Sequence, residues 1–200
     1  NKNGVHEGIS ADLINLISKK LDIKIRLIPT KTWEETLNFS KEKKCDILSF
    51  LNETPKRKEW LNFTNPIFED PNVIVGRNEF DNIEDLSKLQ NKTIAIPKGT
   101  AMYEKFEKDF PNLIIIPVET ENEAFSLVEN KKADMTVRSL IIAAYTIKKE
   151  NLFNLKILAK PLEYKNQLRI GVIKEEPILV NILNKGIRNI TKKEHEYIIN

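Results

Sequence analysis

The stretch Leu48–Phe68, LSFLNETPKRKEWLNFTNPIF, decides the fold that the rest of the chain is expected to adopt. Its strand-like start becomes irregular at Phe50. Thr54-Pro55 then predicts a short helical turn, because threonine is a good N-cap and proline fits the first helical position, where a missing N–H costs nothing. Leu61–Phe63 alternates as a strand does, so the stretch is expected to form a strand, a turn and a second strand.

The predicted turn carries Lys56, Arg57 and Lys58. An arginine at a helix start that follows a strand is well placed to hold an anion, because its planar fork matches a carboxylate and the free backbone N–H groups add positive charge. The three residues are equally consistent with a solvated basic turn, since charged side chains mostly lie at the surface. The stretch by itself leaves both interpretations open.

A family resemblance favours the first interpretation. The motifs Thr-Pro-x-Arg (54–57) and Phe-Thr-x-Pro (63–66), after a Cys-Asp-Ile strand (45–47), resemble the signature of the type II periplasmic solute-binding proteins, and more narrowly their amino-acid-binding branch, family 3. Further motifs in matching order extend the resemblance over nearly the whole chain. It implies that Arg57 clamps the α-carboxylate of a small-molecule ligand, with no cofactor.

Composition and charge exclude several other classes. The 200 residues are 40% hydrophobic and 30% charged, which suits a globular protein with a sizeable core. The net charge of +3 comes from interleaved signs, so no nucleic-acid partner is expected. The single cysteine, Cys45, is expected to be a buried small hydrophobe. We find no membrane-spanning run and no signal peptide, and because Asn1 is not methionine we expect the chain to be part of a longer precursor.

Alternating helical and strand patterns predict an α/β class with a partly parallel sheet. Ser10 is expected to cap a helix that runs to Leu21, and the isoleucine-rich Ile23–Ile28 to form a strand. The capping box of Thr32 and Glu35 starts a second helix. The other expected elements are strands at 45–49, 71–76, 93–96, 113–118, 133–137, 155–159 and 168–173, and helices at 83–89 (capped by Asn82), 101–110, from 120, 140–150, from 177 (with Ile178 and Ile182 on its apolar side) and from 191.

The resemblance implies a two-lobe clamshell of the type II periplasmic-binding-protein fold, each lobe a mixed sheet flanked by helices. The expected limits are 1–75 and 168–200 for lobe 1, 78–160 for lobe 2, and 71–78 and 161–168 for the extended crossings between them. The chain departs from the family pattern at its start, because the strand that normally precedes Gly8 is missing.

Five further residues are predicted to contact the ligand in such a fold. Thr100 follows Gly99 at a helix start, where glycine permits close backbone approach and the helix end favours an anion. Asn52 matches a polar contact position of the family, and Phe50 and Trp33 resemble its aromatic walls. Ordinary alternatives stay open, namely an N-cap role for Thr100 and core packing for the two aromatic residues.

Arg138 and Ser139 complete the predicted site, because they end a strand where ligands bind in open α/β sheets. Arg138 is also consistent with a surface charge. In amino-acid binders of the family, an aspartate five residues after Asp134 pairs with the ligand's ammonium, and Ser139 occupies that position. The sequence therefore predicts a small carboxylate without a free α-ammonium, or one whose amine is held elsewhere, for instance by Glu69 or Glu119.

No catalytic residue and no metal site is predicted. His6 and His195 lack partner ligands, and no P-loop or dinucleotide fingerprint is present. The competing enzyme hypothesis is a cyclohexadienyl or arogenate dehydratase on the same fold, for which Glu53, Glu69 and Glu119 are candidate cleft carboxylates. None of the three stands beside a recognisable partner, which favours binding without chemistry.

Two uses of a solute-binding domain remain in competition. The segment Ser139–Leu155 resembles receptor-attached members of the family more than transport proteins. We therefore expect a sensor domain attached to a membrane-embedded receptor, such as a histidine kinase. The alternative is the solute-binding component that delivers its ligand to an ABC permease. Both place the domain in the periplasm or at the outer face of the cytoplasmic membrane.

Overall fold

The computed structural model describes residues 6–159 and 165–199. The chain divides into two units, which are described separately below. Unit 1 consists of Asn1–Lys31, Glu35–Glu69 and Gln167–Asn200, and unit 2 of Thr32–Glu34 and Asp70–Asn166. Strands β3 (Phe68–Arg77) and β8 (Lys165–Ile173) contain the two main boundaries and are neighbours in the strand order β1-β8-β3-β6-β4-β5. The predicted lobe limits stay predictions.

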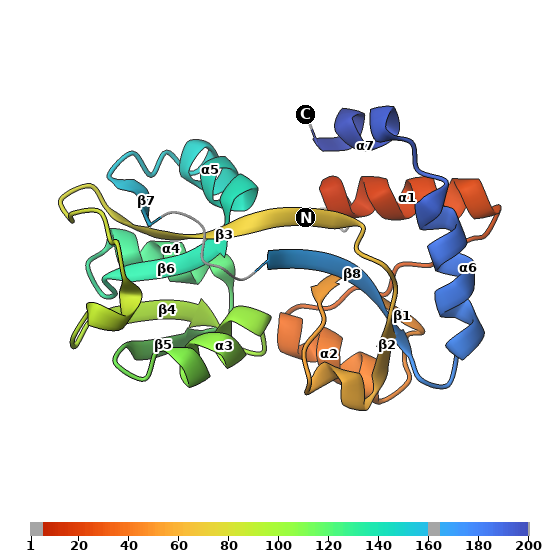
Figure 1. The fold of residues 1–200 in the computed structure, drawn as a ribbon, viewed down its shortest axis with the longest axis horizontal. Helices are drawn as coiled ribbons and strands as arrows, with labels where there is room; N and C mark the ends of the chain where they lie inside the picture. The colour runs from red at the N-terminus through yellow and green to blue at the C-terminus, as the bar shows by residue number, and fades with distance from the viewer. Residues whose placement is uncertain (1–5, 160–164, 200) are drawn as a thin grey trace. The chain divides into compact units, whose positions relative to one another are not determined.

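Unit 1 is built around β8, which pairs antiparallel with β1 (Ile47–Asn52) and with β2 (Leu61–Phe63). The core consists of Ile14, Ile17, Ile67, Ile170, Val172 and Leu183. The other elements are α1 (Ile9–Leu21), α2 (Trp33–Lys41, of which the first two residues belong to unit 2), the 3-10 helix η1 (Arg57–Glu59), α6 (Pro177–Arg188) and α7 (Lys192–Ile199) (Figure 1).

Helices α1 and α6 approach closely because α6 has a glycine at the contact. A Cβ on Gly186 would lie 2.8 Å from Leu21 Cδ1 and 3.0 Å from Ile17 Cγ2. The two helices lie side by side, and their apolar faces bury Ile17 and Leu183 (Figure 1). Helix α7 is joined to α1 by the ion pair of Glu194 and Lys20, at 2.9 Å.

Unit 2 has a mixed sheet with helices α3 and α4 after its parallel strands. Strands β4, β5 and β6 are parallel, whereas β3 pairs antiparallel with β6 and with β7. Two apolar clusters form the core, one around Val75 and Phe125 and the other around Ile94 and Phe106. The elements are β4 (Thr93–Pro97), α3 (Ala101–Asp109), β5 (Ile114–Val118), α4 (Glu121–Glu129), β6 (Met135–Ser139), α5 (Leu140–Lys149), β7 (Leu155–Ala159) and the 3-10 helix η2 (Leu86–Lys88) (Figure 1).

The predicted strand Ile23–Ile28 is wrong. These residues have no regular secondary structure and pair with no strand in the described part of the chain. Isoleucine favours a strand only where a neighbouring strand completes the backbone hydrogen bonds. Here Ile23 and Ile25 instead pack their side chains against the core of unit 1.

Two predicted helix caps are also wrong. Helix α1 begins after Gly8 (φ 93°), and Ser10 lies in its first turn, where its hydroxyl donates to Ser49 Oγ at 3.4 Å. The predicted helix 83–89 shortens to η2, and Asp85 rather than Asn82 caps it by accepting from the Ser87 N–H at 2.9 Å. Several polar residues near a helix start compete for the cap, and the sequence does not rank them.

Two expectations near the C-terminus need correction. Of the predicted crossing 161–168, residues 161–164 lie outside the described residues and 165–168 belong to strand β8. On α6, Ile178 is 71% exposed and Ile182 is 41% exposed, because Leu183 and Gly186 face the core instead. In the described residues no helix is long and apolar enough to cross a membrane.

Candidate functional site

The segment from β1 to η1 folds around the side chain of Arg57 in unit 1. The pairing of β1 with β8 is irregular between Leu48 and Leu51, and Phe50 takes a positive φ of 62°. Thr54 Oγ1 then accepts a hydrogen bond from the Arg57 backbone N–H at 3.2 Å, which starts the helical turn. Arg57 is only 2% exposed, so the predicted solvated turn is not its environment.

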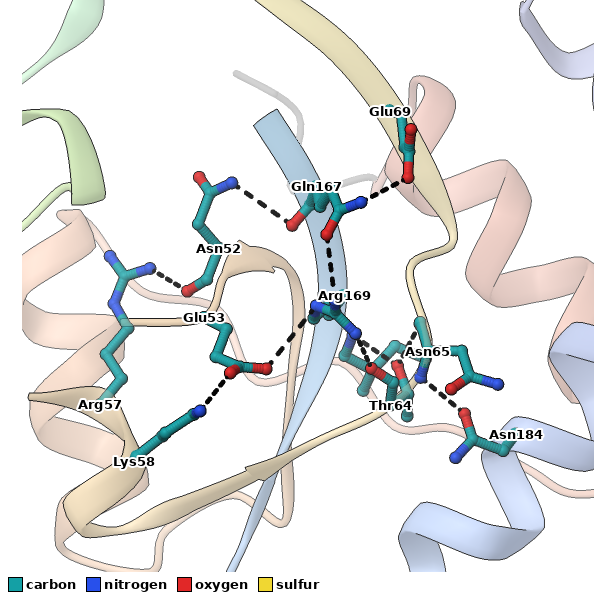
Figure 2. A network of polar contacts seen from close by, with 11 residues as sticks. Asn52, Glu53, Arg57, Lys58, Thr64, Asn65, Glu69, Gln167, Arg169 and Asn184 are labelled. Atoms are coloured by element: carbon teal, nitrogen blue, oxygen red, sulfur yellow. Dashed lines mark hydrogen bonds and ion pairs between the residues drawn. The ribbon is translucent and has the colours of Figure 1, made fainter. Parts of the chain in front are cut away.

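The structure brings Arg57 and Asn52 together. Arg57 Nη1 donates to the backbone oxygen of Asn52 at 2.6 Å, and Asn52 Nδ2 donates to the backbone oxygen of Gln167 at 3.3 Å (Figure 2). The guanidinium is therefore held by the strand that precedes it in the sequence, and that strand is held by β8. A guanidinium fixed in this way loses little conformational freedom when it binds an anion.

A polar network that the sequence did not indicate continues from Gln167 (Figure 2). Gln167 Nε2 donates to Glu69 Oε1 at 2.7 Å, and Arg169 Nη2 donates to Gln167 Oε1 at 3.1 Å. Arg169 also lies 3.8 Å from Glu53, which pairs with Lys58. Sequence analysis missed Gln167 because it was assigned to the crossing 161–168. Arg169 lies in the predicted strand 168–173, and its partners are distant in sequence.

Phe50 lies against the core of unit 1. It is half-buried, and its ring centroid is 5.4 Å from that of Phe68. This contact accounts for an aromatic residue at the position by packing alone. The predicted role of Phe50 as a ligand wall stays a prediction.

In unit 2, the carboxyl ends of β4, β5 and β6 lie at one edge of the sheet because these strands are parallel. Helices α3, α4 and α5 begin within four residues of those ends. Helix N-termini present free N–H groups and positive partial charge, so this edge favours anionic groups. The predicted residues Gly99, Thr100, Arg138 and Ser139 all lie at this edge.

Thr100 is the N-cap of α3, as predicted from the sequence. Its Oγ1 accepts from the Tyr103 N–H at 3.2 Å and donates to the Pro97 oxygen at 2.8 Å. Gly99 has a φ of 68°, a conformation that glycine adopts without strain. Trp33, which belongs to unit 2, donates from Nε1 to the Gly99 oxygen at 3.0 Å.

Arg138 is held in an ion pair, whereas the Ser139 hydroxyl does not cap the helix that follows it. Arg138 forms an ion pair through Nη2 with Glu121, so its positive charge is balanced. Ser139 is 5% exposed and precedes α5, but its hydroxyl makes no capping bond. The carboxylate of Asp70 replaces that cap by accepting from the Ile141 N–H at 3.0 Å.

Asn72 lies directly opposite Ser139 in the β3–β6 ladder. It is 3% exposed, and its Nδ2 has no hydrogen-bond partner among the described residues. An unsatisfied buried donor costs free energy, so this one is suited to an acceptor oxygen of a bound molecule. Sequence analysis missed Asp70 and Asn72 because they lie far from Ser139 in the chain.

The carboxylates proposed from the sequence as holders of an amine are already paired. Glu69 accepts from Gln167, and Glu119 pairs with Lys98 at 2.8 Å. The hydrogen bond and charge of Glu119 raise the pKa of Lys98 above its usual value. Neither carboxylate is therefore an unoccupied partner for a ligand ammonium.

The surroundings of Cys45 and His195 account for these two residues without a role in a site. Burial, and then the charge of Asp46, raise the pKa of the half-buried Cys45 thiol, which favours its neutral form. His195 contacts the Ile67 oxygen at 3.0 Å through Nε2. In the part of the chain that the structure describes, no group of three or more histidine, cysteine, aspartate or glutamate side chains has the arrangement of a metal site.

Unit 2 also contains a cavity of about 410 Å³ that includes none of the predicted site residues. Met135 and Leu158 form its apolar floor, and residues 80–92 form most of its rim. Lys92 closes one side by pairing with Asp134 at 3.5 Å. Its position separates it from the sheet edge at which Thr100 and Ser139 lie, since Asp134 precedes β6 and Lys92 precedes β4.

Comparison with known proteins gives two kinds of relative, a sensor protein and a binding protein. Virulence sensor protein BvgS of Bordetella pertussis is 24% identical over 192 residues, which cover 96% of this chain but only 16% of BvgS. The crystal structure of the BvgS periplasmic VFT2 domain has a TM-score of 0.83 and 25% identity, covering 96% of this chain and 82% of that one. A mutant of ArgBP from T. maritima has a TM-score of 0.85 and 25% identity, covering 100% and 86%.

These likenesses confirm the predicted fold class, a mixed α/β fold that matches periplasmic binding protein structures. The model of the family described as bacterial extracellular solute-binding proteins, family 3, matches residues 1–199, which is nearly the whole chain. The chain therefore belongs to family 3 of the bacterial extracellular solute-binding proteins.

Proposed function

We propose that this domain binds a small carboxylate-bearing solute and that Arg57 holds the carboxylate. The observation that carries the proposal is the environment of Arg57, which is buried to 2% exposure and fixed through Asn52 and Thr54. A buried, oriented guanidinium is the group best suited to bidentate recognition of a carboxylate. The resemblance of the motif Thr-Pro-x-Arg to the family signature supports this assignment of Arg57.

The groups around Ser139, taken within unit 2 by themselves, favour oxygen acceptors. Ser139 offers a hydroxyl, Asn72 an unsatisfied N–H donor, and α5 its N-terminus. The Asn72 donor and the helix N-terminus favour an acceptor over an ammonium, whereas the Ser139 hydroxyl serves either. The preferred ligand is therefore a small carboxylate without a free α-ammonium, such as a hydroxy, keto or second carboxylate acid.

The role proposed for the domain is that of an extracytoplasmic sensor attached to a membrane receptor. The sensor protein BvgS is a relative over 96% of this chain, and this supports the sensor over the transport role. The alternative is the solute-binding component of an ABC transporter, which the similarity to ArgBP supports. A transmembrane helix and a signalling domain encoded downstream favour the sensor, whereas a lipoprotein cysteine near the start of the gene product contradicts it.

Binding without chemistry is part of the proposal. Glu53 pairs with Lys58 and lies near Arg169, Glu69 accepts from Gln167, and Glu119 pairs with Lys98. All three candidate carboxylates are therefore engaged by neighbouring polar side chains. Formation of an aromatic product from prephenate or arogenate by the purified domain would contradict the proposal.

A thermal-shift screen tests the proposed ligand class. The panel contains hydroxy acids, keto acids, dicarboxylates and amino acids, together with amines and neutral sugars that carry no carboxylate, at millimolar concentration. A ligand of micromolar affinity adds about 4 kcal/mol at a thousandfold excess over Kd, which such a screen detects. Small-angle scattering of the hit complex then measures whether binding is accompanied by the closure that the family fold implies. A panel that stabilises the domain only with non-carboxylates overturns the proposal.

A further inference from the structure

We infer that Gln167 is a positioning residue, which connects the guanidinium of Arg57 to the two strands through which the chain leaves and re-enters unit 1. The inference rests on the proposed role of Arg57 as the carboxylate clamp. Glu69 is the last residue of unit 1 before the first of these boundaries, and Gln167 is the first residue after the second. Their side chains are joined by the 2.7 Å hydrogen bond from Gln167 Nε2 to Glu69 Oε1.

The amide of Gln167 has only one orientation that satisfies its neighbours. Its Oε1 accepts from Arg169 Nη2 at 3.1 Å, and its Nε2 donates to Glu69 Oε1. A guanidinium only donates and an ionised carboxylate only accepts, so the two ends of the amide are not interchangeable. Gln167 is therefore matched to both partners in a way that neither a glutamate nor a lysine reproduces.

The backbone of Gln167 continues the connection to Arg57. The Gln167 oxygen accepts from Asn52 Nδ2 at 3.3 Å, and the Asn52 oxygen accepts from Arg57 Nη1 at 2.6 Å (Figure 2). Glu69, Gln167, Asn52 and Arg57 thus form an unbroken series of hydrogen bonds. A displacement of Gln167 moves the acceptor of Asn52, and Asn52 in turn carries the acceptor of Arg57.

A second series runs parallel to the first through Arg169. Arg169 Nη1 donates to the Thr64 oxygen at 2.8 Å, and its Nε lies 3.8 Å from Glu53, which pairs with Lys58 (Figure 2). Glu53 and Lys58 are the sequence neighbours of Asn52 and Arg57. Both sides of the clamp segment 52–58 are therefore fixed by β8 residues 167 and 169.

This arrangement couples occupancy of the clamp to the crossing strands. Coupling between the clamp and the crossing strands requires contacts whose geometry depends on both. The hydrogen bonds from Glu69 to Arg57 provide such contacts within unit 1. A ligand carboxylate that shifts the Arg57 guanidinium also shifts its acceptor, the Asn52 oxygen. The hydrogen bond from Asn52 Nδ2 then transmits this shift to Gln167. The same contacts act in reverse, so a change at the crossing strands alters the geometry that the clamp presents.

A charge-swap series in the ligand-free domain tests the inference. Gln167→Glu sets a carboxylate against Glu69, Glu69→Gln keeps an acceptor for the amide, and the double variant restores one donor and one acceptor. Hydrogen exchange at the Lys58 N–H, which donates to the Thr54 oxygen, and the NMR shift of the Asn52 side-chain NH₂ report on the clamp. Gln90→Glu, at an exposed position of unit 2, is the matched control.

The expected pattern is specific to positioning. Gln167→Glu shifts the Asn52 signal and raises exchange at Lys58 about 2- to 10-fold, the factor that corresponds to loss of one hydrogen bond. Glu69→Gln and the double variant stay near the wild type, as does Gln90→Glu. An unchanged Asn52 signal in Gln167→Glu, or a double variant no closer to the wild type than Gln167→Glu, overturns the inference. Because no ligand is present, this result is independent of whether Arg57 binds a carboxylate.

Discussion

The carboxylate of Asp70 caps helix α5 by accepting a 3.0 Å hydrogen bond from the backbone N–H of Ile141. Ser139 is the residue at the N-cap position, but its hydroxyl leaves the cap unmade. A buried carboxylate at a helix N-terminus is stabilised both by the N–H group and by the helix dipole. Asp70 therefore links the start of β3 to the start of α5 within unit 2.

Replacing Asp70 with alanine is expected to destabilise the domain by about 1–2 kcal/mol, because the half-buried Ile141 N–H at the start of α5 loses its acceptor. Ser139→Ala is the matched control at the same helix end, and it should cost less because the serine side chain makes no cap bond. Chemical denaturation measures both changes. Equal losses in the two variants would show that Asp70 is not the working cap.

Arg57→Ala is expected to abolish binding of the carboxylate found in the screen while the domain still folds. Truncating one partner of a desolvated charge pair costs about 2–5 kcal/mol of binding free energy. Arg26→Ala removes an exposed arginine of unit 1 and should leave the affinity unchanged. Isothermal calorimetry gives the affinities, and thermal melting establishes that each variant is folded.

The contrary outcome for Arg57 is a variant that melts as the wild type does and binds with the same affinity. Arg57→Lys separates charge from shape, because lysine keeps the charge but lacks the planar fork. We expect Arg57→Lys to recover only part of the affinity that alanine loses.

Matched ligand pairs test the predicted preference at Ser139. An amino acid is compared by calorimetry with its 2-hydroxy and 2-oxo analogues, which share its carbon skeleton. We expect the oxygen analogues to bind more tightly, because Ser139 and Asn72 offer hydrogen-bond donors whereas Arg138 is already paired with Glu121. Ser139→Asp should reverse the preference by supplying an ion pair for the ammonium.

Tight binding of the amino acid alone, in a complex in which Ser139 contacts the ammonium, would show the predicted preference to be wrong. Asp70 would then be the nearby carboxylate to examine, since Glu69 and Glu119 have partners of their own.

The stability of the contact between α1 and α7 is expected to depend on pH. A hydrogen bond from Lys20, together with those from the Thr191 N–H and hydroxyl, lowers the pKa of Glu194 from 4.5 to about 2. Because the folded-state pKa is depressed, the stabilisation is present above pH 4.5 and is lost as the pH falls toward about 2. The difference in stability between the wild type and Glu194→Gln should shrink across that range. A pH-independent difference would contradict the assignment.

The sequence by itself determined the features that depend on neighbours along the chain. Thr100 caps α3, and Thr191 and Glu194 form the predicted capping box of α7. In these motifs the donor and the acceptor are three residues apart, so residue types at fixed spacing suffice to predict them. The family motifs around Arg57 belong to the same kind of local signal, and the match over residues 1–199 confirmed the family that they predicted.

Only the tertiary structure decided which residues fix the candidate site. Asn52 and Gln167 are 115 residues apart in sequence, and Asp70 and Ile141 are 71 apart. The strand expected at Ile23–Ile28 was wrong for a related reason, since a strand exists only where a second one pairs with it. The local pattern predicts which element each segment is able to form. The pairing of β3 with β6 and of β1 with β8 determines which of those segments meet. Buried polar groups then form hydrogen bonds with the partners that this pairing brings close.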